Sequence, residues 1–165
     1  MIVILMGVSG SGKSTIGQQL AQALGWCFVE GDDLHPIANV EKMRQGIPLT
    51  DADREPWLQA IGQQISQLQQ AKQAAVITCS ALKQRYREGL QSTQPPGTLQ
   101  FVYLKVSPAV LRSRLTQRQG HFMQAFLLDS QLAALEEPTQ AITIGLTATD
   151  TTTQIVAQIR QQLAV

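Results

Sequence analysis

The chain has 165 residues, a length typical of one domain, and its 13 basic residues nearly balance its 12 acidic residues, so its net charge is +1. This balance gives no support for a nucleic-acid or membrane-surface partner. No segment approaches the roughly 20 consecutive apolar residues of a membrane span, and no signal peptide is visible, so we expect a soluble, cytoplasmic protein. Cys27 and Cys79 are too few and too far apart for a zinc site, and we expect reduced core thiols rather than a disulfide.

The N-terminal segment contains a phosphate-binding loop. Residues 2–6 are apolar and predict a buried strand, and residues 7–14, G-V-S-G-S-G-K-S, match G-x-x-x-x-G-K-[ST] just before a helical pattern. Glycines let backbone N–H groups close around phosphates, and the positive end of the helix adds to the attraction. We expect Lys13 to reach the β- and γ-phosphates of a nucleoside triphosphate and the Ser14 hydroxyl to ligate Mg²⁺. The predicted nucleotide-binding residues of the loop are Gly7, Val8, Ser9, Gly10, Ser11, Gly12, Lys13, Ser14 and Thr15.

Strands and helices alternate along the rest of the chain. After a first helix that ends at Gly25, further strands are predicted at 26–30, 75–79, 99–106 and 141–146. The helices between them are predicted at about 35–45, 51–70, 83–90, 108–117 and 125–135, with a last helix after Thr151. Thr50 and Asp51 are candidate caps, and Pro56 suits a first helical turn. The alternation predicts an α/β fold with a five-stranded parallel sheet covered by helices on both faces, and ligands beyond the carboxyl ends of the strands.

Charged residues follow the second and third predicted strands. Asp32 and Asp33 come after the second, where a carboxylate could orient an acceptor hydroxyl and take its proton, although a solvated acidic turn is the alternative. Lys83, Arg85 and Arg87 come after the third, where they would suit an anionic substrate or form a solvated helix face.

A second group of arginines, Arg112, Arg114 and Arg118, precedes a glycine-containing segment at 120–123. This arrangement fits a closing lid that excludes water and neutralises a transferring phosphate, or a surface helix with extended arginines. The third strand is not followed by an acidic residue, and the chain has no Asn-Lys-x-Asp motif. Both absences favour a small-molecule kinase over a motor ATPase or a GTPase.

Four motifs together carry a family resemblance: D-x-L-H-P at 32–36, P-L-x-D-x-D-R-x-P-W at 48–57, C-S-A-L-K at 79–83 and G-H-F-M at 120–123. With the phosphate-binding loop, they resemble the gluconate kinase (gluconokinase) family, which belongs with the shikimate-kinase-like small P-loop kinases. The resemblance extends from the start of the chain to about Pro138. It implies a three-layer P-loop kinase fold, transfer of the ATP γ-phosphoryl group to the 6-hydroxyl of D-gluconate with Mg²⁺, and a homodimer.

The resemblance also implies roles for particular residues. Lys13, Asp32 and Arg118 match catalytic positions, and Ser14 and Asp32 match the metal site. Arg114 resembles an arginine near the adenine, and Arg118 begins a lid at about 118–137 of a single domain spanning 1–165. The positions suited to the sugar acid are Asp32, His35, Arg54, Lys83, Arg87 and His121.

Two hypotheses compete with gluconate phosphorylation. The chain could be a related kinase of another small hydroxy acid, such as shikimate, or a regulator that binds ATP and a sugar acid without turnover. Whichever acid binds, its carboxylate needs cations, and we expect Lys83 and Arg87 to supply them.

Overall fold

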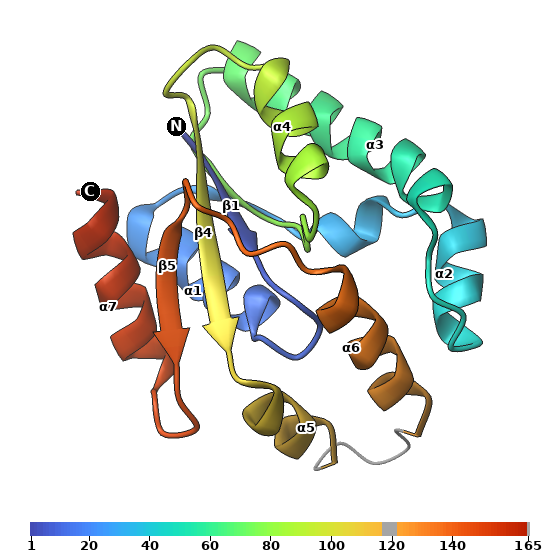
Figure 1. Cartoon of the computed structure of the whole chain (residues 1–165). Helices are drawn as coiled ribbons and strands as arrows, with labels where there is room; N and C mark the ends of the chain where they lie inside the picture. Colours follow the sequence, from blue (N-terminus) through green and yellow to red (C-terminus); the bar gives the residue numbers. More distant parts are fainter. Residues whose placement is uncertain (117–121, 165) are drawn as a thin grey trace.

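The computed structural model describes residues 1–116 and 122–164, and its centre is a parallel five-stranded sheet with the strand order β2-β3-β1-β4-β5 (Figure 1). The strands are β1 (Ile2–Met6), β2 (Cys27–Val29), β3 (Ala75–Thr78), β4 (Leu99–Val106) and β5 (Ile142–Leu146). The middle strand β1 pairs with β3 and β4, so that Ile4 lies opposite both Ile77 and Phe101. The predicted sheet is therefore confirmed, with strand ends displaced by at most one residue.

Helices cover both faces of this sheet, as the alternation predicts. They are α1 (Lys13–Leu24), α2 (Ile37–Arg44), α3 (Asp51–Gln70), α4 (Gln84–Ser92), α5 (Pro108–Thr116), α6 (Phe122–Ala134) and α7 (Thr152–Leu163), with a 3₁₀ helix η1 (Gly31–Leu34). In Figure 1, α3 and α4 lie on one side of the sheet and α1 and α7 on the other. The three-layer α/β fold expected of a P-loop kinase is confirmed.

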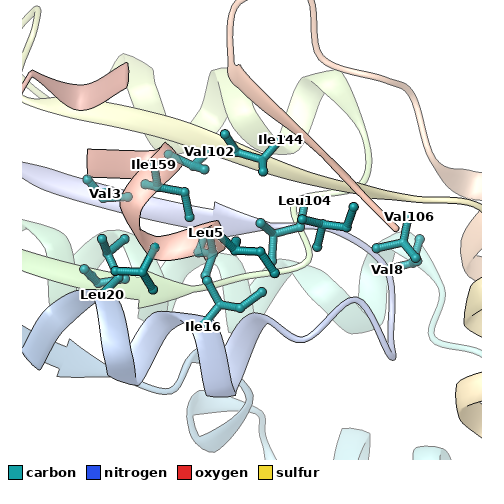
Figure 2. Close-up of a cluster of buried hydrophobic side chains, with 14 of the residues drawn as sticks. Val3, Leu5, Val8, Ile16, Leu20, Val102, Leu104, Val106, Ile144 and Ile159 are labelled. Carbon is teal, nitrogen blue, oxygen red and sulfur yellow. The ribbon is translucent and has the colours of Figure 1, made fainter. Parts of the chain in front are cut away.

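Alternate residues of β1 enter two separate hydrophobic clusters. Val3 and Leu5 pack in the cluster that includes Ile16 of α1 and Ile159 of α7 (Figure 2), whereas Ile4 faces the cluster of α3 and α4. Every residue of β1 is fully buried, which explains its unbroken apolar sequence. This double burial fixes β1, and with it the start of the loop that follows.

Three local predictions differ from the structure. Cys79 is buried but Cys27 is exposed, because β2 is an edge strand, so the expectation of two core thiols is wrong for Cys27; both are free cysteines. Pro56 lies in the second turn of α3, because Thr50 and Asp53 form a capping box that starts the helix at Asp51. The acidic turn after β2 is a short 3₁₀ helix, which has no sequence period long enough to be recognised.

The carboxyl ends of β1, β2 and β3 all point to one edge of the sheet. The phosphate-binding loop follows β1, η1 follows β2, and the loop before α4 follows β3. The chain passes from β3 on one side of β1 to β4 on the other, so the strand order reverses beside β1, and such switch points are where open α/β sheets bind ligands. No described helix has the length and apolar character needed to span a bilayer.

Candidate active site

A cleft of about 390 Å³ lies at this edge of the sheet. One side is residues 7–15, which we call the phosphate wall. The other is the acceptor wall, formed by Asp32, His35, Arg54 and Trp57 from η1, α3 and the turn between η1 and α2. Helix α6 closes a third side with Leu127, Ser130 and Gln131. Nine residues predicted for the site therefore share one cavity: Ser9, Gly10, Gly12, Lys13, Ser14, Thr15, Asp32, His35 and Arg54.

The larger described groove, about 530 Å³, lies elsewhere, between α3 and α4. Gly62 and Gly89 face into open space there, which leaves the two helices without side chains to fill the gap. Of the residues considered for the site, the groove contains only Arg85, which pairs with Asp51. We therefore locate the candidate active site by its chemistry and not by cavity size.

The phosphate wall is built by local backbone conformation. Gly10 and Gly12 have φ angles of 81° and 94°, in the left-handed region that favours glycine. Lys13 begins α1, and its Nζ donates to the Val8 carbonyl oxygen at 3.0 Å. Burial lowers the pKa of Lys13, and the negative charge of Asp32 opposes that shift.

Two residues from the C-terminal half of the chain hold this loop. Arg114 of α5 donates from Nη1 to the Gly10 carbonyl oxygen at 3.1 Å, and the side-chain oxygen of Gln131 on α6 accepts from the Ser9 N–H at 2.6 Å. The Ser9 amide belongs to the set that would face phosphate oxygens in a P-loop. In this structure the Ser9 N–H instead donates its hydrogen bond to the side-chain oxygen of Gln131.

The acceptor wall depends on contacts between segments that are distant in the sequence. The N–H of Gly31 donates to Thr78 Oγ1 at 2.9 Å, and Trp57 Nε1 donates to the Gly31 carbonyl oxygen at 2.7 Å. A Cβ on Gly31 would lie 1.8 Å from the Thr78 carbonyl oxygen, so any side chain there would clash with backbone. Gly31 is thus held between β3 and α3, and it fixes the start of η1, where Asp32 follows.

His35 stacks on Trp57, with ring centroids 4.3 Å apart and planes 12° from parallel. Its Nδ1 lies 3.3 Å from Nδ2 of Asn39, a buried residue of α2 whose Nδ2 also donates to the Asp53 carbonyl oxygen at 2.7 Å. Burial lowers the pKa of His35, Asp32 raises it, and Arg54 lowers it. The ring is therefore held in place by Asn39 of α2 and by the aromatic face of Trp57.

Arg54 is the cation of the acceptor wall. It is 9% exposed, and the described residues give its guanidinium no hydrogen-bond or ion-pair partner. A guanidinium that faces a cleft without a protein acceptor can bind a carboxylate through paired hydrogen bonds. Arg54 is thus available for an anionic ligand in the cleft.

The structure does not bring Lys83 and Arg87 into this cleft. Lys83 pairs with Asp51 at 2.9 Å, and Asp51 also accepts from Arg85 and the Tyr86 hydroxyl. These contacts tie the start of α3 to the start of α4.

Arg87 is 7% exposed and donates from Nη1 to the carbonyl oxygens of Ala81 and Leu82, at 2.8 and 3.1 Å. Ala81 has a φ angle of 42°, rare for a residue with a side chain, so Arg87 supports a strained turn. Both cations already have partners among the described residues.

The remaining predicted residues have a mixed outcome. Arg114 holds the phosphate-binding loop through Gly10, and the structure gives it no contact that identifies an adenine site. Arg118, His121 and the start of the predicted lid lie outside the described residues. The sequence reasoning gave no role to Asn39, Trp57, Thr78 and Gln131. Only Trp57 had a signal, as part of the 48–57 motif; the other three are ordinary polar residues until the fold places them.

Ser14 and Asp32 also fit a magnesium ion. Both are exposed in the same cleft and supply one hydroxyl and one carboxylate oxygen. Mg²⁺ usually keeps several waters and binds through one or two protein oxygens plus substrate phosphates. Among the described residues, no group of three or more His, Cys, Asp or Glu could hold a metal without such help. The donor set is that of a metal that binds together with a nucleotide.

Comparisons with known proteins identify the family of this chain. A family model described as an AAA domain matches residues 2–138. A gluconokinase from Gluconobacter oxydans (strain 621H) is 53% identical over 136 residues, which cover 82% of this chain and 75% of that protein.

Two solved kinase structures are also similar to this chain. The unliganded structure of a sugar kinase from Janibacter sp. HTCC2649 has a TM-score of 0.87 at 40% identity, over 99% of this chain and 94% of that one. A gluconokinase from Sinorhizobium meliloti 1021 has a TM-score of 0.81 at 41% identity, over 98% and 94% of the two chains. The matched residues carry both walls of the cleft, and the chain belongs to the gluconokinase family.

Proposed function

We propose that this protein transfers the γ-phosphoryl group of ATP to the 6-hydroxyl of D-gluconate, giving 6-phosphogluconate and ADP. The observation that carries the proposal is the shared cleft, which places the Lys13 ammonium on the phosphate wall and the Asp32 carboxylate on the acceptor wall of one cavity. Family membership supplies the choice of gluconate.

The phosphate wall binds and neutralises the nucleotide. Backbone N–H groups of residues 9–15 receive phosphate oxygens, and Lys13 leaves the Val8 carbonyl to reach the β- and γ-phosphates. Ser14 and Asp32 would hold Mg²⁺, which supplies positive charge to the phosphates when bound. Lys13 then stabilises the charge that develops as the γ-phosphoryl group departs.

The acceptor wall orients the hydroxyl. The Asp32 carboxylate accepts the proton of the 6-hydroxyl as the new O–P bond forms and the bond to the ADP oxygen breaks. Its fixed position depends on Gly31, which Thr78 and Trp57 hold from opposite sides. Asp33 is exposed and does not line the cleft, which favours Asp32 as the catalytic carboxylate.

Arg54 is the best candidate for the gluconate carboxylate. It is buried at the cleft without an acceptor of its own, whereas Lys83 and Arg87 are engaged by Asp51 and by backbone carbonyls. A role for Lys83 or Arg87 would require those contacts to break. The assignment therefore moves from the cluster after β3 to the third residue after the start of α3.

Three further features are proposals on the family resemblance. Residues 118–137 would form a lid that closes over the nucleotide, with Arg118 and His121 reaching the substrates. The protein would act in the cytoplasm as a homodimer. Sedimentation analysis of the purified protein tests the dimer.

One assay tests the reaction. ADP release is coupled to NADH oxidation with D-gluconate, shikimate, other polyhydroxy acids and the neutral polyol glucitol as acceptors, and the product is identified by ³¹P NMR. We expect gluconate to give the highest kcat/KM and 6-phosphogluconate as product. A preference for shikimate would assign another hydroxy acid, and ATP binding with no transfer to any acceptor would indicate a regulator.

A further inference from the structure

Asn39 has an unusual position for an amide with no catalytic chemistry of its own. It is 3% exposed on α2, and it is the only asparagine in the chain. Its Nδ2 contacts two groups, the Asp53 carbonyl oxygen at 2.7 Å and His35 Nδ1 at 3.3 Å. A buried amide that uses both protons on defined partners holds those partners in a fixed relation.

The Asp53 contact settles the orientation of the amide. A carbonyl oxygen can only accept, so the group that faces it must be the NH₂ of Asn39 and not the side-chain oxygen. The second N–H of the same nitrogen then faces His35 Nδ1, which must accept it. A neutral imidazole whose Nδ1 accepts carries its proton on Nε2.

We propose that Asn39 is a positioning residue that fixes His35 as the neutral Nε2–H tautomer, so that His35 donates a hydrogen bond to the gluconate carboxylate beside Arg54 and does not act as a base. Trp57 restricts the ring from rotating, because His35 stacks on it. Nε2 has no protein partner among the described residues, and His35 lines the cleft. The inference rests on the proposed function, in which Arg54 binds that carboxylate.

The contact at Nδ1 is that of a neutral ring. Asp32 of η1 and Arg54 of α3 are the charged groups that line the cleft beside His35. Protonation would also place an Nδ1–H against the Asn39 NH₂, so it would break the 3.3 Å contact. A carboxylate is only an acceptor, so a donor at Nε2 suits it and a lone pair does not.

The tautomer can be read without turnover. The chain has two histidines, so ¹⁵N-histidine labelling gives two rings, and a His121→Gln variant assigns them. Between pH 7 and 8 we expect His35 Nδ1 to have the chemical shift of an unprotonated nitrogen and Nε2 that of a protonated one. Protonated Nδ1 in the wild type would overturn the proposal, whether or not the protein phosphorylates gluconate.

The Asn39→Asp variant replaces the donor with an acceptor of the same shape. We expect Nδ1 to become protonated, and kcat/KM for gluconate to fall about tenfold at high pH, where the neutral ring presents a lone pair at Nε2. As pH decreases and the ring is fully protonated, Nε2–H returns and the defect should shrink, with KM for ATP unchanged throughout. Gln45→Glu, which adds the same charge at the exposed end of α2, is the control and should show no such pH dependence.

Two results would overturn the proposal. A defect in Asn39→Asp that is constant with pH would indicate a merely structural role. A changed tautomer with unchanged gluconate kinetics would show that His35 does not contact the substrate. If Asn39→Asp does not fold, Asn39→Ala with the same NMR and pH measurements replaces it, and retention of a single Nε2–H tautomer in that variant would count against the proposal.

Discussion

The two walls of the cleft are built in different ways. The phosphate wall is one continuous segment, residues 7–15, whose shape comes from glycines with positive φ angles and the start of α1. The acceptor wall is assembled from η1, the turn that follows it, and α3, and it is held by Thr78 of β3. A local motif can therefore specify the first wall, whereas the second needs the whole sheet and α3 to be in place.

The basic side chains also divide into one whose position follows from a local motif and others whose availability depends on the fold. Lys13 has its role from a motif, and its position follows from the loop itself. Arg54, Lys83 and Arg87 all look suitable for an anion in the sequence, but only Arg54 lines the cleft. Charge in a sequence identifies candidates, and the partners provided by the fold decide which of them remain available for a ligand.

The largest effect is expected from Lys13→Ala. Loss of its charge beside the transferring phosphoryl group should lower kcat by about 10³–10⁵-fold. The melting temperature should change little, because the Val8 carbonyl loses one partly buried hydrogen bond. Coupled ADP release and thermal unfolding measure both, with Lys72→Ala, an exposed lysine after α3, as control. Near-normal turnover would show that Lys13, and with it the phosphate wall, is not catalytic.

Asp32→Asn tests the acceptor wall at its reacting group. The amide keeps the shape but cannot take the hydroxyl proton, so kcat should decrease by about 10²–10⁴-fold while ATP binding stays close to that of the wild type. Asp33→Asn is the matched control, since Asp33 is exposed and outside the cleft. Single-turnover phosphoryl transfer and nucleotide titration separate the two quantities. Greater sensitivity at Asp33 would show that the carboxylate has been assigned to the wrong residue.

Arg54→Ala tests the cation that lines the cleft, and Lys83→Ala and Arg87→Ala test two cations that have protein partners. Removal of a charge-assisted hydrogen bond of about 1.5–3 kcal/mol should lower kcat/KM for gluconate by about 10–150-fold and leave the KM for ATP nearly unchanged. Lys83→Ala and Arg87→Ala should have smaller effects on gluconate and should act mainly on stability, because their contacts are internal.

Glucitol provides the control on the substrate side. Glucitol lacks the carboxylate, so we expect the wild type to phosphorylate it with a low kcat/KM. That kcat/KM should change little in Arg54→Ala. A larger gluconate defect in Lys83→Ala or Arg87→Ala than in Arg54→Ala would return carboxylate recognition to the cluster after β3.

Trp57→Phe tests whether long-range contacts build the acceptor wall. Phenylalanine can keep the stacking on His35 but leaves the Gly31 carbonyl oxygen without its donor. We expect a loss of about 1–3 kcal/mol in the free energy of unfolding. At temperatures where the variant is folded, we expect a lower kcat with an unchanged KM for ATP. Denaturant unfolding and steady-state kinetics measure these, and an unaltered kcat would show that Asp32 does not depend on this contact.

The smallest effect is expected from Gln131→Leu. Its amide oxygen occupies the Ser9 N–H that nucleotide phosphates would use, so removal of this competitor should tighten ATP binding by about 2–10-fold. Isothermal titration with a non-hydrolysable ATP analogue measures the change, with Gln162→Leu on the exposed face of α7 as control. Weaker binding would instead indicate that Gln131 contacts the nucleotide directly.

The sequence by itself determined the sheet, its helices and the phosphate wall. Short apolar runs located all five strands, and β1 is apolar throughout because its alternate residues are buried on opposite faces of the sheet. The residues of the phosphate-binding loop were also readable, since glycine at positive φ and lysine at the helix start are local requirements. The four motifs identified the family, which the relatives confirm.

Only the tertiary structure decided which polar side chains face the cleft. The partners of Arg54, Lys83 and Arg87 come from other elements, so sequence spacing could not separate the available cation from the engaged ones. Asn39 and Trp57 acquire their roles from contacts with Asp53 and Gly31, at sequence separations of 14 and 26 residues. The physical reason is that a side chain's charge and hydrogen-bonding groups are set by its chemistry, whereas its partners are set by how the chain folds.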